Sequence, residues 1–160
     1  MIRVGTGYDL HRLTEGRRFI LGGVTLPASK GLLGHSDADV LTHAVIDALL
    51  GAAALGDIGQ HFPDTDPAYE NADSMELLER VNALLGKEGW RIGNVDATVL
   101  CQNVRLAPHI PAVRASLARR LGLDVSLVSV KAKTNEGLDA VGRGEAVAAQ
   151  VVVLITKEGS

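Results

Sequence analysis

The chain contains very little cysteine and few aromatic residues. Cys101 is the single cysteine among 160 residues, which excludes an internal disulfide and a cysteine-rich zinc site. Aromatic residues make up 3% of the chain, so the core has to be built from leucine, valine, isoleucine and alanine. Hydrophobic residues nevertheless reach 46%, which is ordinary for a globular protein. We therefore expect one domain, residues 1–160, with a substantial core.

An excess of charge and long apolar runs are also missing. The formal net charge is −3, and no run of basic residues gives an electrostatic reason to expect nucleic acid or an anionic membrane. No apolar stretch approaches the roughly 20 residues that span a bilayer. Met1 leads into a strand-like segment instead of a signal peptide. The expectation is a cytoplasmic protein with neither a nucleic-acid nor a membrane partner.

The hydrophobic pattern predicts strands that alternate with helices. Strands are expected at 2–8, 90–101, 127–133 and 146–155, and a hairpin turning at Gly22-Gly23 is expected over 18–26. Loops are expected at 30–34 and 56–67. Three helices are predicted, beginning at a capping box of Ser36 and Asp39, at Asp73 with Glu76, and over 111–121.

These elements indicate an α/β fold, an α+β sandwich in which a mixed sheet of about four main strands carries its helices on one face. The segment 146–155 is an almost unbroken run of small and β-branched residues, which is typical of a strand buried on both faces. If helices cover one face only, the other face needs a partner. A homo-oligomer that buries sheet against sheet is the simplest answer.

The most informative residues are Asp9, His11 and His43. Strand side chains repeat every two residues, so Asp9 and His11 share one face, and His43 lies near the start of a predicted helix. One carboxylate and two imidazoles, with a fourth position open, are typical of catalytic zinc. Taken alone, the Asp-x-His pair is a weak signal, because a chance surface pair explains most such pairs. His43 alone is also compatible with a core or helix-surface histidine.

Two carboxylates flank His43 at helical spacing. Asp39 and Asp47 lie four residues before and after it, so all three are expected on one ridge. A carboxylate there would accept the hydrogen bond of the nitrogen that does not bind metal, which fixes the tautomer. An ordinary solvated helix face explains the same spacing equally well.

Other polar segments each have two interpretations. His35-Ser36 precedes a helix, where free N–H groups favour an anion, although Ser36 can also serve only as a cap. The aspartates of 56–67 suit either turns or polyol hydroxyls. The segment 131–136 combines a hydroxyl, an amide, cations and a carboxylate, which suits phosphate and metal. The segment 142–145 suits a turn with a surface ion pair.

Taken together, these segments resemble the 2-C-methyl-D-erythritol 2,4-cyclodiphosphate synthase family of the non-mevalonate isoprenoid pathway. The resemblance extends from Arg3 to the end of the chain. It rests on GYDLH at 7–11, GLLGHSDADVLTHAVIDALLGAAALGDIG at 31–59, HFPDTDP at 61–67, GNVDATV at 93–99, PHIP at 108–111, VKAKTNE at 130–136 and GRGE at 142–145.

The resemblance implies a set of site residues. Zinc would be held by Asp9, His11 and His43, and a second metal, Mg²⁺ or Mn²⁺, by Glu136. His35 and Thr134 are the implied catalytic residues. The implied substrate contacts are Asp9, His11, His35, Ser36, Asp57, Ile58, Gly59, Phe62, Pro63, Asp64, Thr65, Asp66, Cys101, Arg105, Leu106, Ala107, Ala132, Lys133, Thr134, Asn135, Glu136 and Arg143. The chain departs from the family pattern at Lys133 and Asn135, where relatives carry threonines, and at Ala140, where they often carry phenylalanine beside the trimer axis.

The resemblance also implies a reaction and an assembly. The family converts 4-diphosphocytidyl-2-C-methyl-D-erythritol 2-phosphate to the cyclic diphosphate and CMP, so this chain would be a phosphorus–oxygen lyase. It would bind one zinc per subunit and form a homotrimer with active sites between subunits. Two alternatives remain: a zinc hydrolase that activates water, and a non-catalytic nucleotide-binding module with a structural metal.

Overall fold

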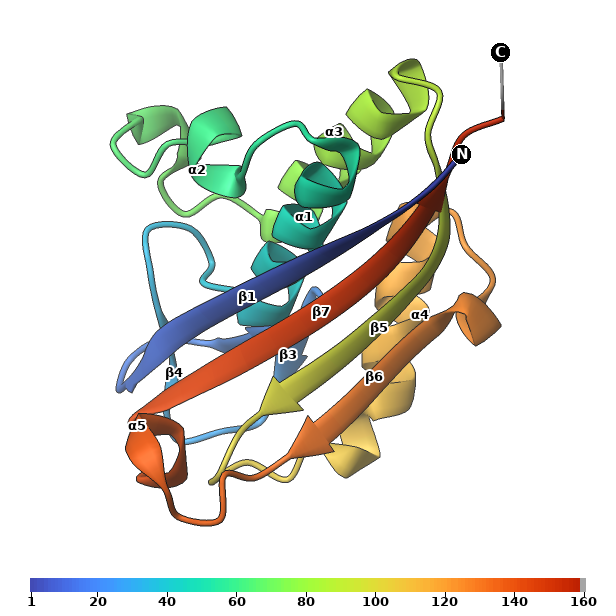
Figure 1. Cartoon of the computed structure of the whole chain (residues 1–160). Helices are drawn as coiled ribbons and strands as arrows, with labels where there is room; N and C mark the ends of the chain where they lie inside the picture. Colours follow the sequence, from blue (N-terminus) through green and yellow to red (C-terminus); the bar gives the residue numbers. More distant parts are fainter. Residues whose placement is uncertain (159–160) are drawn as a thin grey trace.

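The computed structural model describes residues 1–158 and contains a five-stranded mixed sheet (Figure 1). The strands of this sheet run in the order β4-β1-β7-β5-β6, and β2 and β3 form a separate hairpin. The strands are β1 (Ile2–Thr14), β2 (Phe19–Leu21), β3 (Val24–Leu26), β4 (Gly31–Leu33), β5 (Arg91–Leu100), β6 (Val128–Lys133) and β7 (Ala146–Thr156). The α-helices are α1 (Val40–Ala53), α2 (Ile58–His61), α3 (Ser74–Lys87), α4 (Ile110–Leu121) and α5 (Asp139–Gly142).

The predicted fold class is confirmed, with one more strand than expected. Helices α1, α3 and α4 lie on one side of the sheet, and α5 lies at the end where β6 leaves it and β7 begins (Figure 1). Among the described strands, only β5 and β6 pair in parallel, and α4 makes the crossover between them. No helix within residues 1–158 is both long enough and apolar enough to cross a membrane.

Three local predictions are wrong. The segment 30–34 contains strand β4, which pairs with the far end of β1 and is too short to show an alternating pattern. The segment 56–67 contains α2, because Asp57 caps it by accepting from Gln60 N at 3.0 Å. The first helix has Asp39 as its N-cap instead of Ser36, whose Oγ accepts from Ala38 N in the preceding turn.

Strand β1 is longer than predicted and lies very close to α1. A Cβ added to Gly5 would lie 2.0 Å from the carbonyl oxygen of Ala48, and one added to Gly7 would lie 1.9 Å from that of Ala44. Glycine at these positions, opposite alanines on the helix, is what permits this approach. Since side chains alternate along a strand, Asp9 continues the face of the two glycines and points toward the N-terminal turn of α1.

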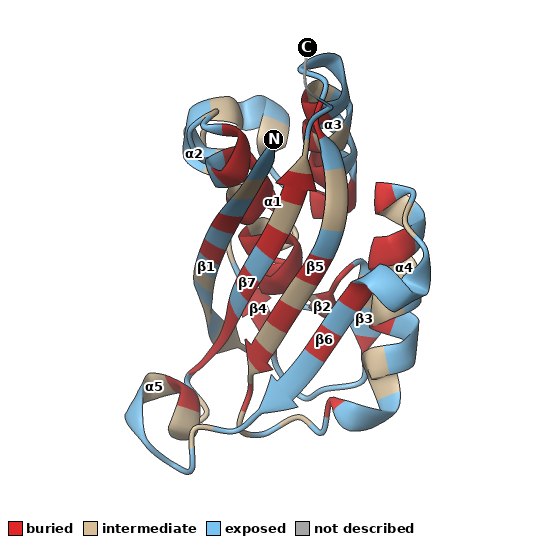
Figure 2. Ribbon diagram, turned by 45° about the vertical axis from the view of Figure 1, so that its right-hand side comes forward, coloured by how far each residue is buried: buried red, intermediate tan, exposed pale blue. Residues whose placement is uncertain are grey.

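The opposite face of the sheet carries exposed apolar side chains. Val4 is 63% exposed and Tyr8 58%, and Leu10 and Val152 are also exposed. The prediction that 146–155 is buried on both faces holds for Ala146–Ala149 but is wrong beyond them, where exposed and buried residues alternate (Figure 2). The buried part is covered on this face by Val141 of α5, which packs against Ala146 and Ala148.

Candidate functional site

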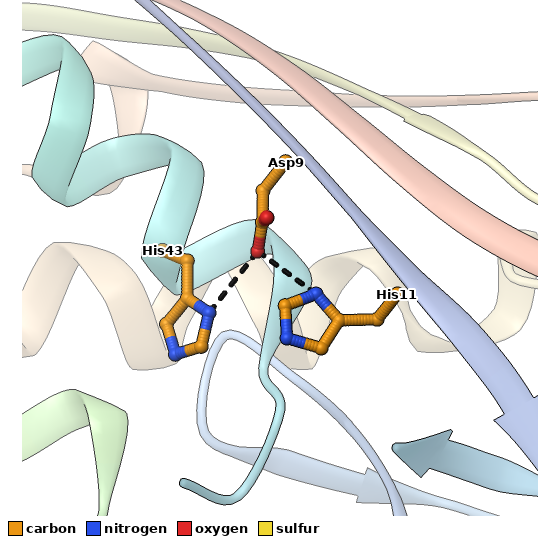
Figure 3. Close-up of side chains that lie close together, drawn as sticks. All are labelled: Asp9, His11 and His43. Carbon is orange, nitrogen blue, oxygen red and sulfur yellow. Dashed lines mark hydrogen bonds and ion pairs between the residues drawn. The ribbon is translucent and has the colours of Figure 1, made fainter. Parts of the chain in front are cut away.

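Asp9 and His11 of β1 meet His43 in the first turn of α1 (Figure 3). The Nδ1 atoms of both histidines lie 3.0 Å from Asp9 Oδ2. One ligand atom from each of the three residues lies within 4.8 Å of the others, so together they could hold a metal ion. The contact of His11 Nδ1 with Asp9 is close enough for an ion pair but is not a hydrogen bond, so this buried nitrogen has no hydrogen-bond partner within the described residues, as expected of a nitrogen whose partner is an ion. The three residues therefore fit a divalent metal.

The electrostatics of the triad favour the same interpretation. Burial alone would raise the pKa of Asp9, but its interactions with the imidazoles of His11 and His43 lower it well below its ordinary value. Burial likewise would lower the pKa of His43, but the Asp9 carboxylate raises it. A carboxylate held ionised beside two imidazoles is a donor set typical of transition-metal sites.

The second ring nitrogen of His43 faces hydroxyl groups. Its Nε2 lies 2.8 Å from Ser74 Oγ and 3.1 Å from Ser36 Oγ. The Asp37 carboxylate in turn accepts hydrogen bonds from both the hydroxyl and the backbone N–H of Ser74. Ser74 and Asp37 were missed by sequence reasoning. Asp37 lies inside the family motif at 31–59. Ser74 belongs to no motif, and the sequence pattern assigns the start of its helix to Asp73.

The side chains of Asp39 and Asp47, which were predicted to be partners of His43, accept hydrogen bonds from other groups instead. Asp39 is fully buried and accepts hydrogen bonds from Thr42 N and Oγ1 and from the backbone N–H groups of Gly22 and Gly23. Burial raises the pKa of Asp39, and these donors oppose the shift. Asp47 accepts from Ile58 N at 2.8 Å. The carboxylate-ridge prediction is therefore wrong, because both side chains turn to backbone donors.

A cavity of about 390 Å³ opens beside the triad. Its wall includes the predicted metal ligand His43 and seven predicted substrate contacts, His11, His35, Ser36, Ile58, Gly59, Phe62 and Asp64. Gly34, Tyr69 and Leu77 also line it and were not predicted. His35 is held at the cavity by a contact of 3.3 Å between its Nε2 and the carbonyl oxygen of Asp66.

A second cavity of about 360 Å³ lies where β5 and β6 end. Parallel strands bring their carboxyl ends to one edge, so the segment after β5 meets the end of β6 there. The predicted contacts that line it are Cys101, Arg105, Leu106, Ala107, Ala132, Lys133 and Thr134. Gln102, Asn103 and Val104 also line it and fall within 101–107, the segment that the family resemblance assigns to the nucleotide. No residue lines both this cavity and the one beside the triad.

The remaining predicted residues line neither cavity. Besides Asp9 of the triad, they are Asp57, Pro63, Thr65, Asp66, Asn135, Glu136 and Arg143. Glu136 is exposed in a left-handed backbone conformation with φ of 53°, and it accepts from Thr134 Oγ1 at 3.3 Å. Arg143 forms an exposed ion pair of 2.8 Å with Glu145, which matches the surface-pair interpretation of this segment.

Arg17 fixes the backbone on which His35 and Ser36 stand. Its guanidinium donates to the carbonyl oxygens of Leu32, Gly34 and Ser36 at 3.2, 3.1 and 2.9 Å. Sequence reasoning missed this contact, because Arg17 lies in a loop and a loop arginine gives no pattern that points to a partner. The bidentate geometry of arginine suits the binding of several carbonyl oxygens at once.

Known proteins resemble the whole chain. The model of the YgbB family matches residues 2–156. A 2-C-methyl-D-erythritol 2,4-cyclodiphosphate synthase from Clostridium perfringens is 56% identical over 98% of this chain and 100% of its own length. The structure of the bifunctional IspDF from Campylobacter jejuni matches with a TM-score of 0.95 and 40% identity, over 99% of this chain and 43% of that one. The CDP complex of IspF from Plasmodium falciparum matches with a TM-score of 0.86 and 32% identity, over 99% and 97%.

Proposed function

Because the chain belongs to the YgbB family, we propose that it converts 4-diphosphocytidyl-2-C-methyl-D-erythritol 2-phosphate to 2-C-methyl-D-erythritol 2,4-cyclodiphosphate and CMP. An oxygen of the 2-phosphate attacks the β-phosphorus of the same molecule, and the bond between that phosphorus and the CMP oxygen breaks. The observation that carries the proposal is the Asp9–His11–His43 triad beside a cavity lined by His35 and Ser36.

Zinc is the metal that we propose for the triad. One carboxylate oxygen and two imidazole nitrogens, with a position left for a phosphate oxygen, are the ligands of a catalytic zinc site. When bound there, zinc would supply Lewis-acid charge that orients and polarises the diphosphate. Glu136 is the residue we propose for a second divalent ion, Mg²⁺ or Mn²⁺. Its exposure leaves its carboxylate free to bind an ion that arrives with the substrate.

The protein's own residues act mainly by positioning. An intramolecular phosphoryl transfer needs the nucleophile and phosphorus held in line, and such placement provides much of the acceleration. We assign the methylerythritol unit to the cavity beside the triad and the cytidine to the cavity at Cys101–Ala107. His35 and Thr134 would donate hydrogen bonds to the charge that develops on the β-phosphate.

A homotrimer with active sites between subunits completes the proposal. Two observations support it: the two cavities of one chain share no residue, and the open sheet face exposes Val4, Tyr8 and Val152. An apolar face of this kind is typical of an interface between subunits. Light scattering at micromolar concentration should give three times the mass of the chain, and a stable monomer would contradict the assembly.

We place this enzyme in the cytoplasm, as expected from the composition.

Incubation of the zinc-loaded protein with the cytidylyl substrate tests the reaction directly. We expect release of CMP together with a second product whose phosphorus spectrum shows a cyclic diphosphate. Incorporation of oxygen from labelled water would instead identify a zinc hydrolase. Zinc binding without turnover would identify a nucleotide-binding module with a structural metal.

A further inference from the structure

We infer that Ser74 and Asp37 form a hydrogen-bonded chain that orients His43 for its metal, which makes Ser74 a positioning residue of the site. The inference rests on the proposed function of Asp9, His11 and His43 as a metal centre. The two residues reach His43 from separate segments, since Ser74 begins α3 and Asp37 lies in the turn before α1. The chain therefore joins the metal centre to the start of a second helix.

The direction of each hydrogen bond follows from what each group can donate. An ionised Asp37 carboxylate has no hydrogen to give, so the Ser74 hydroxyl must donate to it. The Ser74 oxygen is then left as an acceptor 2.8 Å from His43 Nε2. His43 must therefore carry its ring hydrogen on Nε2. In the neutral ring that binds a metal, the lone pair is thereby placed on Nδ1, the nitrogen that faces Asp9 at 3.0 Å.

Ser36 does not replace Ser74 in this role. Its oxygen lies 3.1 Å from His43 Nε2 and already accepts from Ala38 N at 3.2 Å. Among residues 1–158 its hydrogen has no carboxylate partner, so it could donate to Nε2 and favour the opposite tautomer as readily as it could accept. Only the chain through Ser74 ends on a carboxylate and therefore has a fixed direction.

Capping of α3 does not explain the Ser74 hydroxyl. The helix has Asp73 as its N-cap, whose Oδ1 accepts from Met75 N at 2.8 Å. Ser74 is fully buried, and a buried hydroxyl is expected to have a partner for both its hydrogen and its oxygen. Asp37 and His43 are those partners. Outer partners that orient a metal-binding histidine typically change metal affinity 10- to 100-fold when they are removed.

Zinc affinity in Ser74→Ala tests the inference. In competition with a chromophoric chelator, we expect zinc to bind roughly 10- to 100-fold more weakly than to the unaltered protein. Asp37→Asn should weaken binding as well, because an amide can donate to Ser74 and so reverse the direction of the chain. The double variant should bind no more weakly than the worse single variant, since both changes break one chain. If the two substitutions acted through independent structural effects, their losses of zinc binding free energy would add instead.

Asp73→Ala is the matched control, because it disturbs the start of the same helix without touching the chain to His43. We expect it to lower the melting temperature but to keep the zinc affinity of the unaltered protein. Unchanged affinity in Ser74→Ala, or an equal loss in Asp73→Ala, would overturn the inference. If Ser74→Ala fails to fold, unchanged affinity in Asp37→Asn would overturn it equally. Failure of the unaltered protein to bind zinc would instead refute the proposed metal centre.

Discussion

The contact between β1 and α1 predicts a large effect of a single methyl group. In Gly7→Ala the new Cβ would lie 1.9 Å from the Ala44 carbonyl oxygen, whereas an ordinary contact is at least 3.4 Å. The obstacle is backbone on both sides, so no side chain can rotate away. The strand and the helix must separate by roughly 1.5 Å, and we expect a loss of about 3 kcal/mol in the free energy of unfolding, the upper end for an inserted methyl.

The effect is measurable as a shift in melting temperature. For a chain of this size, a loss of about 3 kcal/mol lowers the melting temperature by roughly 6–12 °C. Asp9 follows Gly7 on the same face of β1, so the separation should also move the carboxylate away from His43 and weaken metal binding. Calorimetry at fixed protein concentration, with and without added zinc, would record both losses.

Gly51→Ala is a control on the same helix. Its new Cβ would have no neighbour closer than Thr6 O at 4.0 Å, and alanine favours a helix over glycine by about 0.5–1 kcal/mol. The same chemical change should therefore raise the melting temperature slightly at position 51 and lower it strongly at position 7. A Gly7→Ala protein that melts within about 2 °C of the unaltered one would refute the packing argument.

Four further outcomes are expected. His43→Ala should lose zinc, measured by metal analysis, while keeping its circular dichroism spectrum. Normal zinc content would refute the proposal that the triad binds the zinc. Asp39→Ala should lower the free energy of unfolding in urea by about 3 kcal/mol, because it removes a helix cap and leaves buried N–H donors without an acceptor. Asp57→Asn should weaken productive substrate binding more than folding, since an amide offers one acceptor where a carboxylate offers two; an unchanged kcat/KM would limit Asp57 to capping α2. His35→Ala and Thr134→Ala should each lower kcat roughly 10- to 1000-fold with normal zinc content, and a loss confined to KM would contradict their roles.

The periodic parts of the fold could be predicted from the sequence. Helices α3 and α4 each bury one regular set of apolar residues, whereas α1 and the start of β7 are buried on nearly all sides and read as dense apolar runs. Both kinds of pattern are visible in the chain itself. Strand β4 could not be predicted, because three residues are too few to show an alternation. It forms because the long β1 offers it an edge to pair with.

The meeting of Asp9, His11 and His43 was predictable, but their surroundings were not. The placement of Asp9 and His11 depends only on strand alternation, and that of His43 only on the start of a helix. The groups beyond His43 depend on how the turns before two helices pack together. Asp39 turned to the backbone of the hairpin, and Ser74 approaches from 31 residues away. No local spacing encodes either choice.

The position of β7 in the sheet has a consequence for biosynthesis. It is the last strand described along the chain, yet it lies between β1 and β5 at the centre of the sheet. Residues 2–12 of β1 pair with residues 146–156 of β7, so almost the whole chain separates the partners. Such remote pairings slow folding, because closing the long intervening loop costs chain entropy before the new contacts can compensate for it. Until β7 has been synthesised, β1 has only the three-residue β4 as a described sheet partner, and its other edge stays open to pairing with a second chain.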